Sequence, residues 1–280
     1  MKIKILSDST CDLPKALLEQ YDITLAPLTV VKGDDQFKDG VTITPAEIFA
    51  HVAAGGSLCS TAAVSIGEYS DLFEKYSSEY DAVLHINLGS GFSACHQNAL
   101  LAAEDFSNVR CIDSRNLSSG QGLLVLEACR LALEMENVDS IVDALNSYAE
   151  KIESSFLVEK LEYLVKGGRC SSAAALGANL LNLKPCIELK DGKMAVGKKY
   201  RGNYAKCLSA YVKERLEGRE DVDRTNVFIT WTDVSEESLA LVREAVRTYG
   251  GFANVYESVA GSTISCHCGP GTLGILFVRK

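Results

Sequence analysis

Residues 83–94 read Val-Leu-His-Ile-Asn-Leu-Gly-Ser-Gly-Phe-Ser-Ala, an apolar run that ends in a turn rich in glycine and serine. Val83 to Leu88 has the length and composition of a strand, and the glycines that follow end it. Similar apolar runs recur in the first half of the chain, with amphipathic helical patterns between them. They are Ile3 to Leu6, Ile23 to Val31 and Val109 to Ile112. This alternation predicts an α/β fold with a mostly parallel sheet flanked by helices.

Two of the predicted helices carry a clear signal at their N-termini. Thr44-Pro45-Ala46-Glu47 and Ser65-Ile66-Gly67-Glu68 both match the capping box, in which a hydroxyl and a glutamate satisfy free backbone amides. Apolar residues after the second box, and others after Asp139, recur at the i, i+3, i+4, i+7 spacing of a buried helical stripe. The stripes are Tyr69, Leu72, Phe73 and Tyr76, and Ile141, Leu145, Tyr148 and Ile152.

The second half of the chain has a different pattern. Asp191-Gly192 separates two short apolar runs and is a typical β-hairpin turn. Before it, the glycine loop Lys166 to Arg169 leads into a small-residue helix at residues 171–182. Further helices are predicted at Tyr204 to Leu216 and Ser235 to Thr248, and strands at Val227 to Thr232, Asn254 to Ser258 and Gly274 to Val278. We therefore expect an N-terminal α/β domain at residues 1–153 and a C-terminal α/β domain with a mixed sheet at residues 154–280.

The charge and apolar content of the chain exclude several classes of protein. The 280 residues include 28 Lys and Arg against 37 Asp and Glu, which gives a net charge of −9. A surface of this charge repels nucleic acid and anionic membranes, so we expect neither nucleic-acid binding nor stable membrane insertion. No apolar run approaches the ~20 residues of a membrane-spanning helix, and the N-terminus leads directly into a strand without a signal peptide. We therefore expect a cytoplasmic protein whose ten cysteines stay reduced.

Hydroxyl groups follow the ends of several predicted strands. The strand-end segments are Ser7 to Thr10, Ser90 to Ser93 and Asp113-Ser114, and a further hydroxyl pair, Ser60-Thr61, precedes the helix capped by Ser65. Ligands of open α/β sheets bind at the carboxyl ends of the strands, so we expect these segments to converge on one crevice. Hydroxyls, backbone N–H groups and helix N-termini together favour an anion. The sequence therefore predicts a site for a negatively charged ligand.

Two cationic residues are candidates for the same site. Arg169 follows two glycines, which let the backbone approach a ligand, and its guanidinium offers a planar donor fork. His267 lies on a predicted strand that runs into the turn Gly269-Pro270-Gly271, which we expect to expose its imidazole. On such a strand Cys266 and Cys268 point to one face and His267 to the other, so Cys266-His267-Cys268 is not predicted to bind a metal.

Two other interpretations of the strand-end segments remain open. Gly89 to Ala94 fits the G-x-G-x-x-A pattern of a dinucleotide-binding loop, with Asp113 near the position of a ribose-binding acid. An NAD(P)-binding oxidoreductase is therefore one alternative. Asp8 and Asp113 could instead form the acid and base pair of a hydrolase.

Short motifs along the whole chain, in a specific order and spacing, resemble one family. They are Ser7 to Pro14, Lys38-Asp39-Gly40, Ser60-Thr61 with Ser65 to Tyr69, Ser90 to Ser93, Asp113-Ser114, Leu161 to Arg169, Leu183-Lys184-Pro185 and His267 to Gly271. On these residues the sequence resembles the DegV family of bacterial fatty-acid-binding proteins. The resemblance implies a two-domain α/β protein that holds one long-chain fatty acid in a tunnel between its domains.

The resemblance also implies a role and a set of site residues. It implies that the protein is not itself an enzyme and needs no cofactor or metal. It presents the carboxylate to a separate fatty acid kinase, whose ATP site is dihydroxyacetone-kinase-like, for acyl-phosphate formation and phospholipid synthesis. By the resemblance, Thr61 and Ser93 bind the carboxylate, while Arg169 and His267 support phosphoryl transfer. Further pocket candidates are Ser9, Ser60 and Phe92.

This chain also departs from the family pattern at two places. After Ser93 the family usually continues Gly-Thr-Tyr, whereas Ala94-Cys95-His96 stands here. After Thr61 it usually continues Ser-Gln-Pro-Ser, whereas this chain has Ala62 to Ser65. The chain length and saturation of the preferred fatty acid, and the choice of kinase, are therefore not predicted.

Overall fold

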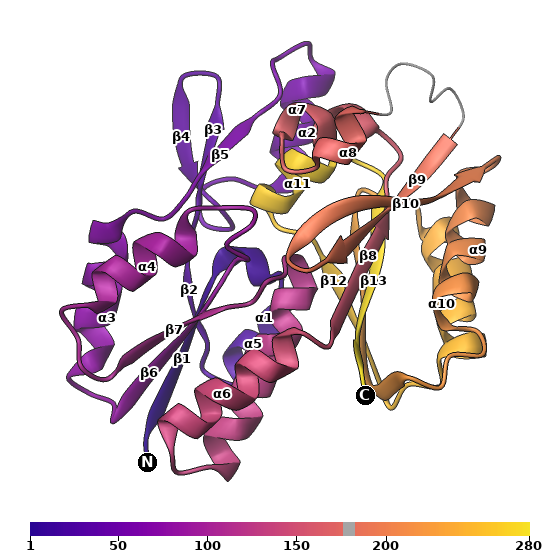
Figure 1. Ribbon diagram of the computed structural model, residues 1–280. Helices are drawn as coiled ribbons and strands as arrows, with labels where there is room; N and C mark the ends of the chain where they lie inside the picture. The colour runs from indigo at the N-terminus through magenta and orange to yellow at the C-terminus, as the bar shows by residue number, and fades with distance from the viewer. Residues whose placement is uncertain (176–182) are drawn as a thin grey trace.

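The structure is a computed structural model that describes residues 1–175 and 183–280 (Figure 1). A four-stranded parallel sheet forms its N-terminal part, in the order β2 (Thr24–Ala26), β1 (Ile3–Asp8), β6 (Ala82–Asn87) and β7 (Val109–Asp113). Successive side chains of each strand point to opposite faces of this sheet. Leu6 and Val83 pack on one face, whereas Ile5 and Leu84 pack on the other.

Helices cover both faces of the parallel sheet. On the Leu6 face lie α3 (Ile66–Ser77) and α4 (Cys95–Ala103), and on the Ile5 face lie α1 (Lys15–Gln20), α5 (Ser118–Glu134) and α6 (Val138–Ala149). The short helix η1 (Ser9–Cys11) follows β1 directly. The predicted parallel sheet flanked by helices is therefore confirmed.

A six-stranded mixed sheet forms the C-terminal part. Its order is β10 (Lys193–Arg201), β9 (Leu183–Lys190), β8 (Ile152–Leu157), β13 (Thr272–Arg279), β11 (Val222–Thr232) and β12 (Asn254–Val259). One face packs against α9 (Tyr204–Leu216) and α10 (Glu236–Gly250). The other face packs against α5, which contacts strands of both sheets and has eleven of its 17 residues buried. The helix α5 therefore belongs to two hydrophobic cores at once.

A smaller third sheet extends the N-terminal part. It is antiparallel, in the order β4 (Asp35–Lys38), β3 (Thr29–Lys32) and β5 (Ser60–Ala62), and α2 (Pro45–Ala53) lies between β4 and β5 in the chain. The C-terminal helix α11 (Ser262–Cys268) packs against β5 and α2. It also contacts α7 (Leu161–Gly167), which is followed by α8 (Ser171–Ala174). Residues far apart in the sequence therefore meet around α11.

Several local predictions are confirmed. Both capping boxes form, because Thr44 and Ser65 each accept a hydrogen bond from the backbone amide of the glutamate three residues later. The hairpin at Asp191-Gly192 joins β9 and β10, and both residues have the positive φ that such a turn requires. The expected strand from Ile23 to Val31 is instead divided into β2 and β3, with Pro27, which has no backbone donor, between them.

Two predicted elements are wrong. Cys266-His267-Cys268 is not a strand but the last turn of α11. Carboxylates distant in the sequence hold the start of this helix, since Gly261 N donates to Asp12 and Ser262 N donates to Asp39. Ile152 is not part of a helical stripe but opens β8, where it pairs with Val278.

Two further predictions concern positions that the structure addresses only in part. The small-residue helix expected at residues 171–182 begins as α8, and residues 176–182 lie outside the described residues. The division into residues 1–153 and 154–280 stays a prediction. The strand β8, which belongs entirely to the six-stranded sheet, begins just before that boundary.

Candidate functional site

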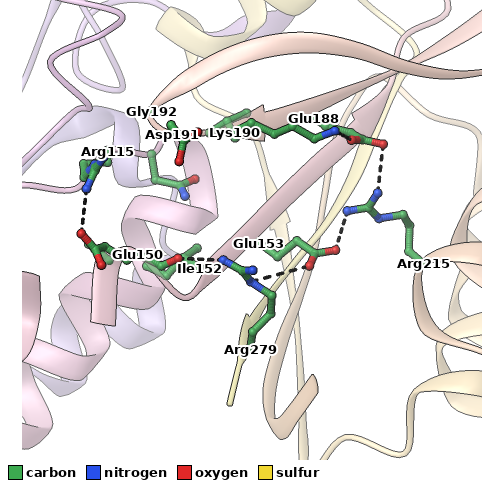
Figure 2. A pocket seen from close by; sticks show the side chains of 13 residues that line it. Arg115, Glu150, Ile152, Glu153, Glu188, Lys190, Asp191, Gly192, Arg215 and Arg279 are labelled. Atoms are coloured by element: carbon green, nitrogen blue, oxygen red, sulfur yellow. Dashed lines mark hydrogen bonds and ion pairs between the residues drawn. The ribbon is translucent and has the colours of Figure 1, made fainter. Parts of the chain in front are cut away.

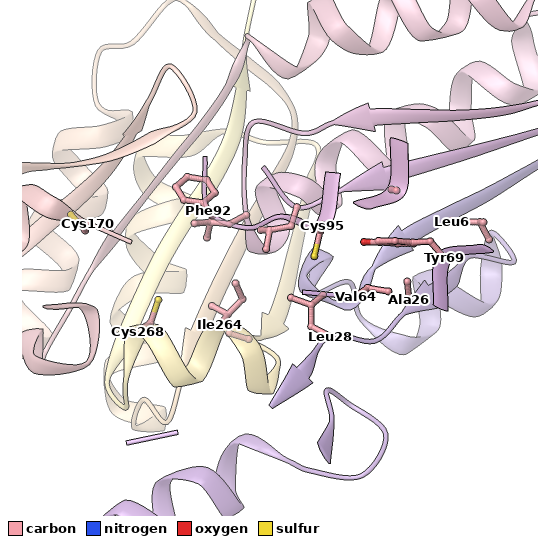
Figure 3. Packing of buried hydrophobic residues seen from close by; sticks show 14 of the residues in the cluster. Leu6, Ala26, Leu28, Val64, Tyr69, Phe92, Cys95, Cys170, Ile264 and Cys268 are labelled. Carbon is pink, nitrogen blue, oxygen red and sulfur yellow. The ribbon is translucent and has the colours of Figure 1, made fainter. Parts of the chain in front are cut away.

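Five of the predicted site residues line one narrow cavity between the small sheet and α11. They are Thr61, Phe92, Ser93, Arg169 and His267. The volume of this cavity is about 50 Å³, and most of its remaining wall is apolar. Figure 3 shows Ile264 and Cys268 on α11 beside Leu28 and Phe92, which belong to the same hydrophobic cluster. The cavity, which we call the head-group cavity, therefore combines a few polar groups with apolar walls.

The head-group cavity has a different neighbour on each side. An outer cavity of about 360 Å³ shares Arg169 and His267 with it, and Lys166 also lines that outer space. A deeper cavity of about 30 Å³ shares Leu117 and Ile264 and is bordered mainly by the six-stranded sheet. Polar groups thus lie toward the outer cavity and apolar groups toward the deep one.

The apolar part of this path is narrow. Cavities that hold a drug-sized ligand usually measure about 300 to 1,000 Å³. The head-group cavity and the deep cavity, at about 50 and 30 Å³, are much smaller. In this structure these two cavities are therefore too small for a ligand of that size.

Thr61 and His267 form a direct polar contact in the head-group cavity. Thr61 is the central residue of β5, and its Oγ1 is 2.8 Å from Nε2 of His267 on the last turn of α11. Burial, together with the nearby positive charge of Arg169, lowers the pKa of His267 to about 4. The imidazole is therefore neutral at pH 7 and contributes a hydrogen bond rather than a charge.

Gly167 fixes the other edge of the imidazole. A Cβ atom at residue 167 would lie 2.5 Å from Nδ1 of His267, closer than real side chains come. Only glycine therefore fits against the His267 ring at this last residue of α7. Nδ1 is buried and has no hydrogen-bond partner among the described residues, which suits an unprotonated nitrogen better than an N–H group.

Ser93 is held in place by the residue two positions further along. Its Oγ accepts a hydrogen bond from Cys95 N at 3.3 Å and donates to Cys95 Sγ at 3.1 Å. Burial raises the pKa of the Cys95 thiol to about 11, so this sulfur stays protonated and uncharged. One of the departures from the family pattern, Cys95, therefore orients a predicted ligand-binding hydroxyl.

Arg169 brings a positive charge to the border of the head-group and outer cavities. Its Nη1 donates to Gly167 O at 2.7 Å and its Nε to Phe92 O at 3.4 Å. Both acceptors are main-chain carbonyls. Over residues 1–175 and 183–280 its guanidinium forms no ion pair with a carboxylate, so its charge is available to a ligand.

The side-chain carboxyl groups of two buried aspartates, not predicted as part of the site, position α11. Asp12 Oδ1 accepts from Gly261 N at 2.9 Å, and Asp39 Oδ1 accepts from Ser262 N at 2.8 Å. Burial raises the pKa of Asp12 to about 8. Asp12 occurs in the motif Ser7 to Pro14, and Asp39 occurs in Lys38-Asp39-Gly40. The motifs therefore pointed to both residues, but they did not indicate that both contact α11.

Two predicted pocket candidates lie outside the head-group cavity. Ser60 precedes Thr61 on β5 and lines the outer cavity instead. Ser9 lines a separate surface cavity, donates to Asp39 Oδ2 at 2.8 Å and accepts from Leu28 N at 3.2 Å. The structure therefore places Ser9 away from the other predicted site residues, with its hydroxyl bonded to Asp39, and its role as a pocket residue stays a prediction.

A further cavity is a charged groove elsewhere on the molecule. Its volume is about 500 Å³, and it lies beside the ion pairs that Figure 2 shows. Arg115 pairs with Glu150, and Arg215 pairs with both Glu153 and Glu188. Because these charges already neutralise one another, the groove offers no excess charge to an ionic ligand.

The nucleotide and hydrolase alternatives do not fit the structure. A Cβ at Gly91 would lie 2.3 Å from Gly192 O, so the turn of the β9–β10 hairpin covers the Gly89 to Ala94 loop. Asp113 is not free for a ribose, since it accepts hydrogen bonds from Ser90 N and Ser90 Oγ. Asp8 is fully buried and accepts from Tyr69 and from the backbone of Leu88, so it does not face a substrate.

The described residues add two further observations. In residues 1–175 and 183–280 no helix is both long and apolar enough to cross a membrane. Within the same ranges, no three potential metal ligands gather at one place.

The fold and the cavity define a class of α/β protein with a parallel and a mixed sheet, in which hydroxyl groups and one guanidinium face an apolar path. The chain belongs to the DegV family: the family model described as an uncharacterised protein of the DegV family matches residues 2–280. A DegV domain-containing protein of Caldanaerobacter subterraneus subsp. tengcongensis is 32% identical over 281 residues, which cover 100% of this chain and 99% of that protein.

Solved structures of DegV proteins have the same fold. A fatty-acid-binding DegV family protein from Thermus thermophilus is 28% identical and superposes over 100% of both chains with a TM-score of 0.90. A stearic-acid-binding protein from Eubacterium ventriosum is 26% identical, with a TM-score of 0.86 over 99% of this chain and 98% of the other. The predicted fold class and family are therefore confirmed.

Proposed function

We propose that this protein binds one long-chain fatty acid, with its carboxylate in the head-group cavity and its acyl chain along the deep cavity. The observation that carries the proposal is the placement of Thr61, Ser93 and Arg169 on one cavity that continues into apolar walls. The fatty-acid-binding DegV proteins of the same fold support it.

The hydroxyl groups suit a carboxylate because each has a neighbour that directs its proton. Thr61 has a single proton to donate, so giving it to a ligand requires Thr61 Oγ1 to accept from Nε2–H of His267. That tautomer leaves Nδ1 unprotonated, in agreement with its lack of a partner among the described residues. Ser93 already accepts from Cys95 N and redirects its own proton from the weak sulfur acceptor to the carboxylate.

The acyl chain supplies most of the affinity. Burial of methylene groups contributes about 0.8 kcal/mol each, so a long tail contributes on the order of 10 kcal/mol. Two hydroxyl–carboxylate hydrogen bonds contribute about 3 to 6 kcal/mol at most. The hydroxyls therefore fix the position of the head group, and the apolar path determines how tightly the molecule is held.

We further propose that the protein presents the bound carboxylate to a separate fatty acid kinase and is not itself an enzyme. The outer cavity supports this role, because Arg169 and Lys166 line it and could neutralise the phosphates of ATP held by the partner. In the transfer, a carboxylate oxygen forms a bond to the γ-phosphorus, the bond from that phosphorus to the bridging oxygen breaks, and ADP leaves with the electron pair. We place this exchange in the cytoplasm, where the ten free thiols would stay reduced.

Extraction of the purified protein with organic solvent tests lipid binding directly. We expect mass spectrometry to find close to one fatty acid per chain. A double variant, Thr61→Val with Ser93→Ala, should retain its fold and carry markedly less. A wild-type protein that is empty after purification, and that takes up no fatty acid when titrated, would contradict the proposal.

Incubation with a fatty acid kinase and ATP tests the second role. His267→Gln should bind fatty acid but yield less acyl phosphate, whereas the exposed-surface variant Asp34→Ala should match the wild type in both measurements. Loss of lipid binding in His267→Gln, with no separate effect on phosphorylation, would show that His267 serves only the ligand site.

A further inference from the structure

One polar residue of the head-group cavity has no role in the site as described so far. Thr263 lies on α11, one helical turn before His267, and lines the same cavity. The residue is only 3% exposed. Its Oγ1 has no hydrogen-bond partner among residues 1–175 and 183–280.

The neighbouring hydroxyls on α11 are satisfied inside the protein. Ser262 Oγ donates to Ile43 O at 3.0 Å, and Ser265 Oγ donates to Ala260 O at 3.3 Å. Buried hydroxyls are nearly always hydrogen-bonded, so one without a protein partner marks a place where another group supplies the bond. Because Thr263 borders the head-group cavity, a group in that cavity is in the right place to do so.

The position of Thr263 also indicates which part of the ligand it meets. Thr263 lines the head-group cavity together with Thr61 and Ser93. The residues that continue into the deep cavity from α11 are Ile264 and Cys268, and Thr263 is not among them. A hydroxyl at this place therefore faces the polar end of the ligand rather than its tail.

We propose that Thr263 donates a third hydroxyl hydrogen bond to the bound carboxylate. This inference rests on the proposed function. A carboxylate has about four acceptor positions, so Thr61 and Ser93 leave room for another donor. The bond would join the head group to α11 and hence to the helix that carries His267.

Affinity measurements with two ligands test this role. Thr263→Val removes the hydroxyl with little change in shape, and Thr263→Ser keeps it. For a long-chain fatty acid we expect Thr263→Val to weaken binding roughly 10- to 100-fold, the range for a hydrogen bond to a charged group. For the primary alcohol of the same chain length, which has no charge, we expect the same substitution to weaken binding less than it does for the acid, by roughly 2- to 10-fold. Thr263→Ser should behave like the wild type with both ligands.

The outcomes separate this inference from the function on which it rests. Wild-type protein that binds neither ligand would overturn both. Wild-type binding of the acid, with equal affinity in Thr263→Val, would overturn the role of Thr263 and leave fatty-acid binding intact. Equal weakening for the acid and the alcohol would also overturn it, because the substitution would then act through cavity shape. Thermal unfolding of each variant checks that the fold is retained.

Discussion

Protonation of His267 should destabilise the protein in acid. The ordinary pKa of this imidazole is 6.5, and burial with the nearby charge of Arg169 lowers it to about 4 in the folded state. Between these values the unfolded chain binds a proton that the folded chain does not. The free energy of unfolding therefore falls as the pH decreases through this range.

The size of the effect follows from the two pKa values. Their difference, from 6.5 to about 4, corresponds to roughly 3 kcal/mol at about 1.36 kcal/mol per pH unit. The stabilising contribution is present above pH 6.5 and is lost as the pH falls to about 4. His267→Gln keeps a polar group near Thr61 but cannot take up the proton, so it should lack this loss.

Urea-induced unfolding of the wild type and His267→Gln, near neutral pH and again at about pH 4.5, measures the difference. The comparison of the two proteins is necessary because Asp12, whose pKa is raised, makes the free energy of unfolding increase as the pH falls through the same range. A nuclear magnetic resonance titration of the four histidines would identify His267 by its absence in the variant. An identical pH dependence of stability in both proteins, or a His267 pKa close to its ordinary value, would refute the reasoning.

Three further predictions concern the groups that hold the site together. Gly167→Ala places a Cβ 2.5 Å from His267 Nδ1, about 0.9 Å closer than the 3.4 Å of an ordinary contact. The imidazole should therefore shift, and its pKa should rise. We expect the free energy of unfolding to fall by roughly 1 to 3 kcal/mol. Gly67→Ala, where nothing lies within 4 Å, is the matched control, and equal behaviour of the two variants would disprove the close approach. Asp39→Ala leaves Ser262 N and Ser9 Oγ without their acceptor, so it should cost roughly 2 to 4 kcal/mol and weaken fatty-acid binding, whereas the exposed Asp34→Ala should change stability by less than about 0.5 kcal/mol. The contribution of Asp12 to stability is fully present below its ordinary pKa of 3.8 and is lost as the pH rises through about 8. Asp12→Asn should therefore reduce the fall in melting temperature at alkaline pH. An unchanged fall would show that Asp12 does not titrate in this range.

The elements that were predicted correctly depend on residues close together in the sequence. The capping boxes at Thr44 and Ser65, and the turn at Asp191-Gly192, are local patterns and were confirmed. The helix α11 could not be predicted in this way. Its sequence is rich in serine, threonine and cysteine, and its first amides are satisfied by Asp12 and Asp39, more than two hundred residues earlier.

The same limit applies to the site. Thr61, Ser93, Arg169 and His267 were named from motifs, and the structure places all four on one cavity, although their roles stay predictions. Ser9 was also named from a motif, because it follows a predicted strand. Its hydroxyl, however, donates a hydrogen bond to Asp39. Thr263 belongs to none of the motifs, so no sequence signal indicated it; only its burial without a partner among the described residues distinguishes it.

The shared helix α5 constrains how a lipid could enter and leave. This helix packs on the parallel and the mixed sheet together. Moving the two sheets apart would therefore expose apolar surface of both hydrophobic cores to water. Exchange of the acyl chain should therefore proceed by small movements of the walls, such as rotations of Phe92 and Ile264, while the frame stays whole. Under the function proposed above, slow spontaneous release would keep a bound fatty acid inside the protein until the proposed kinase binds.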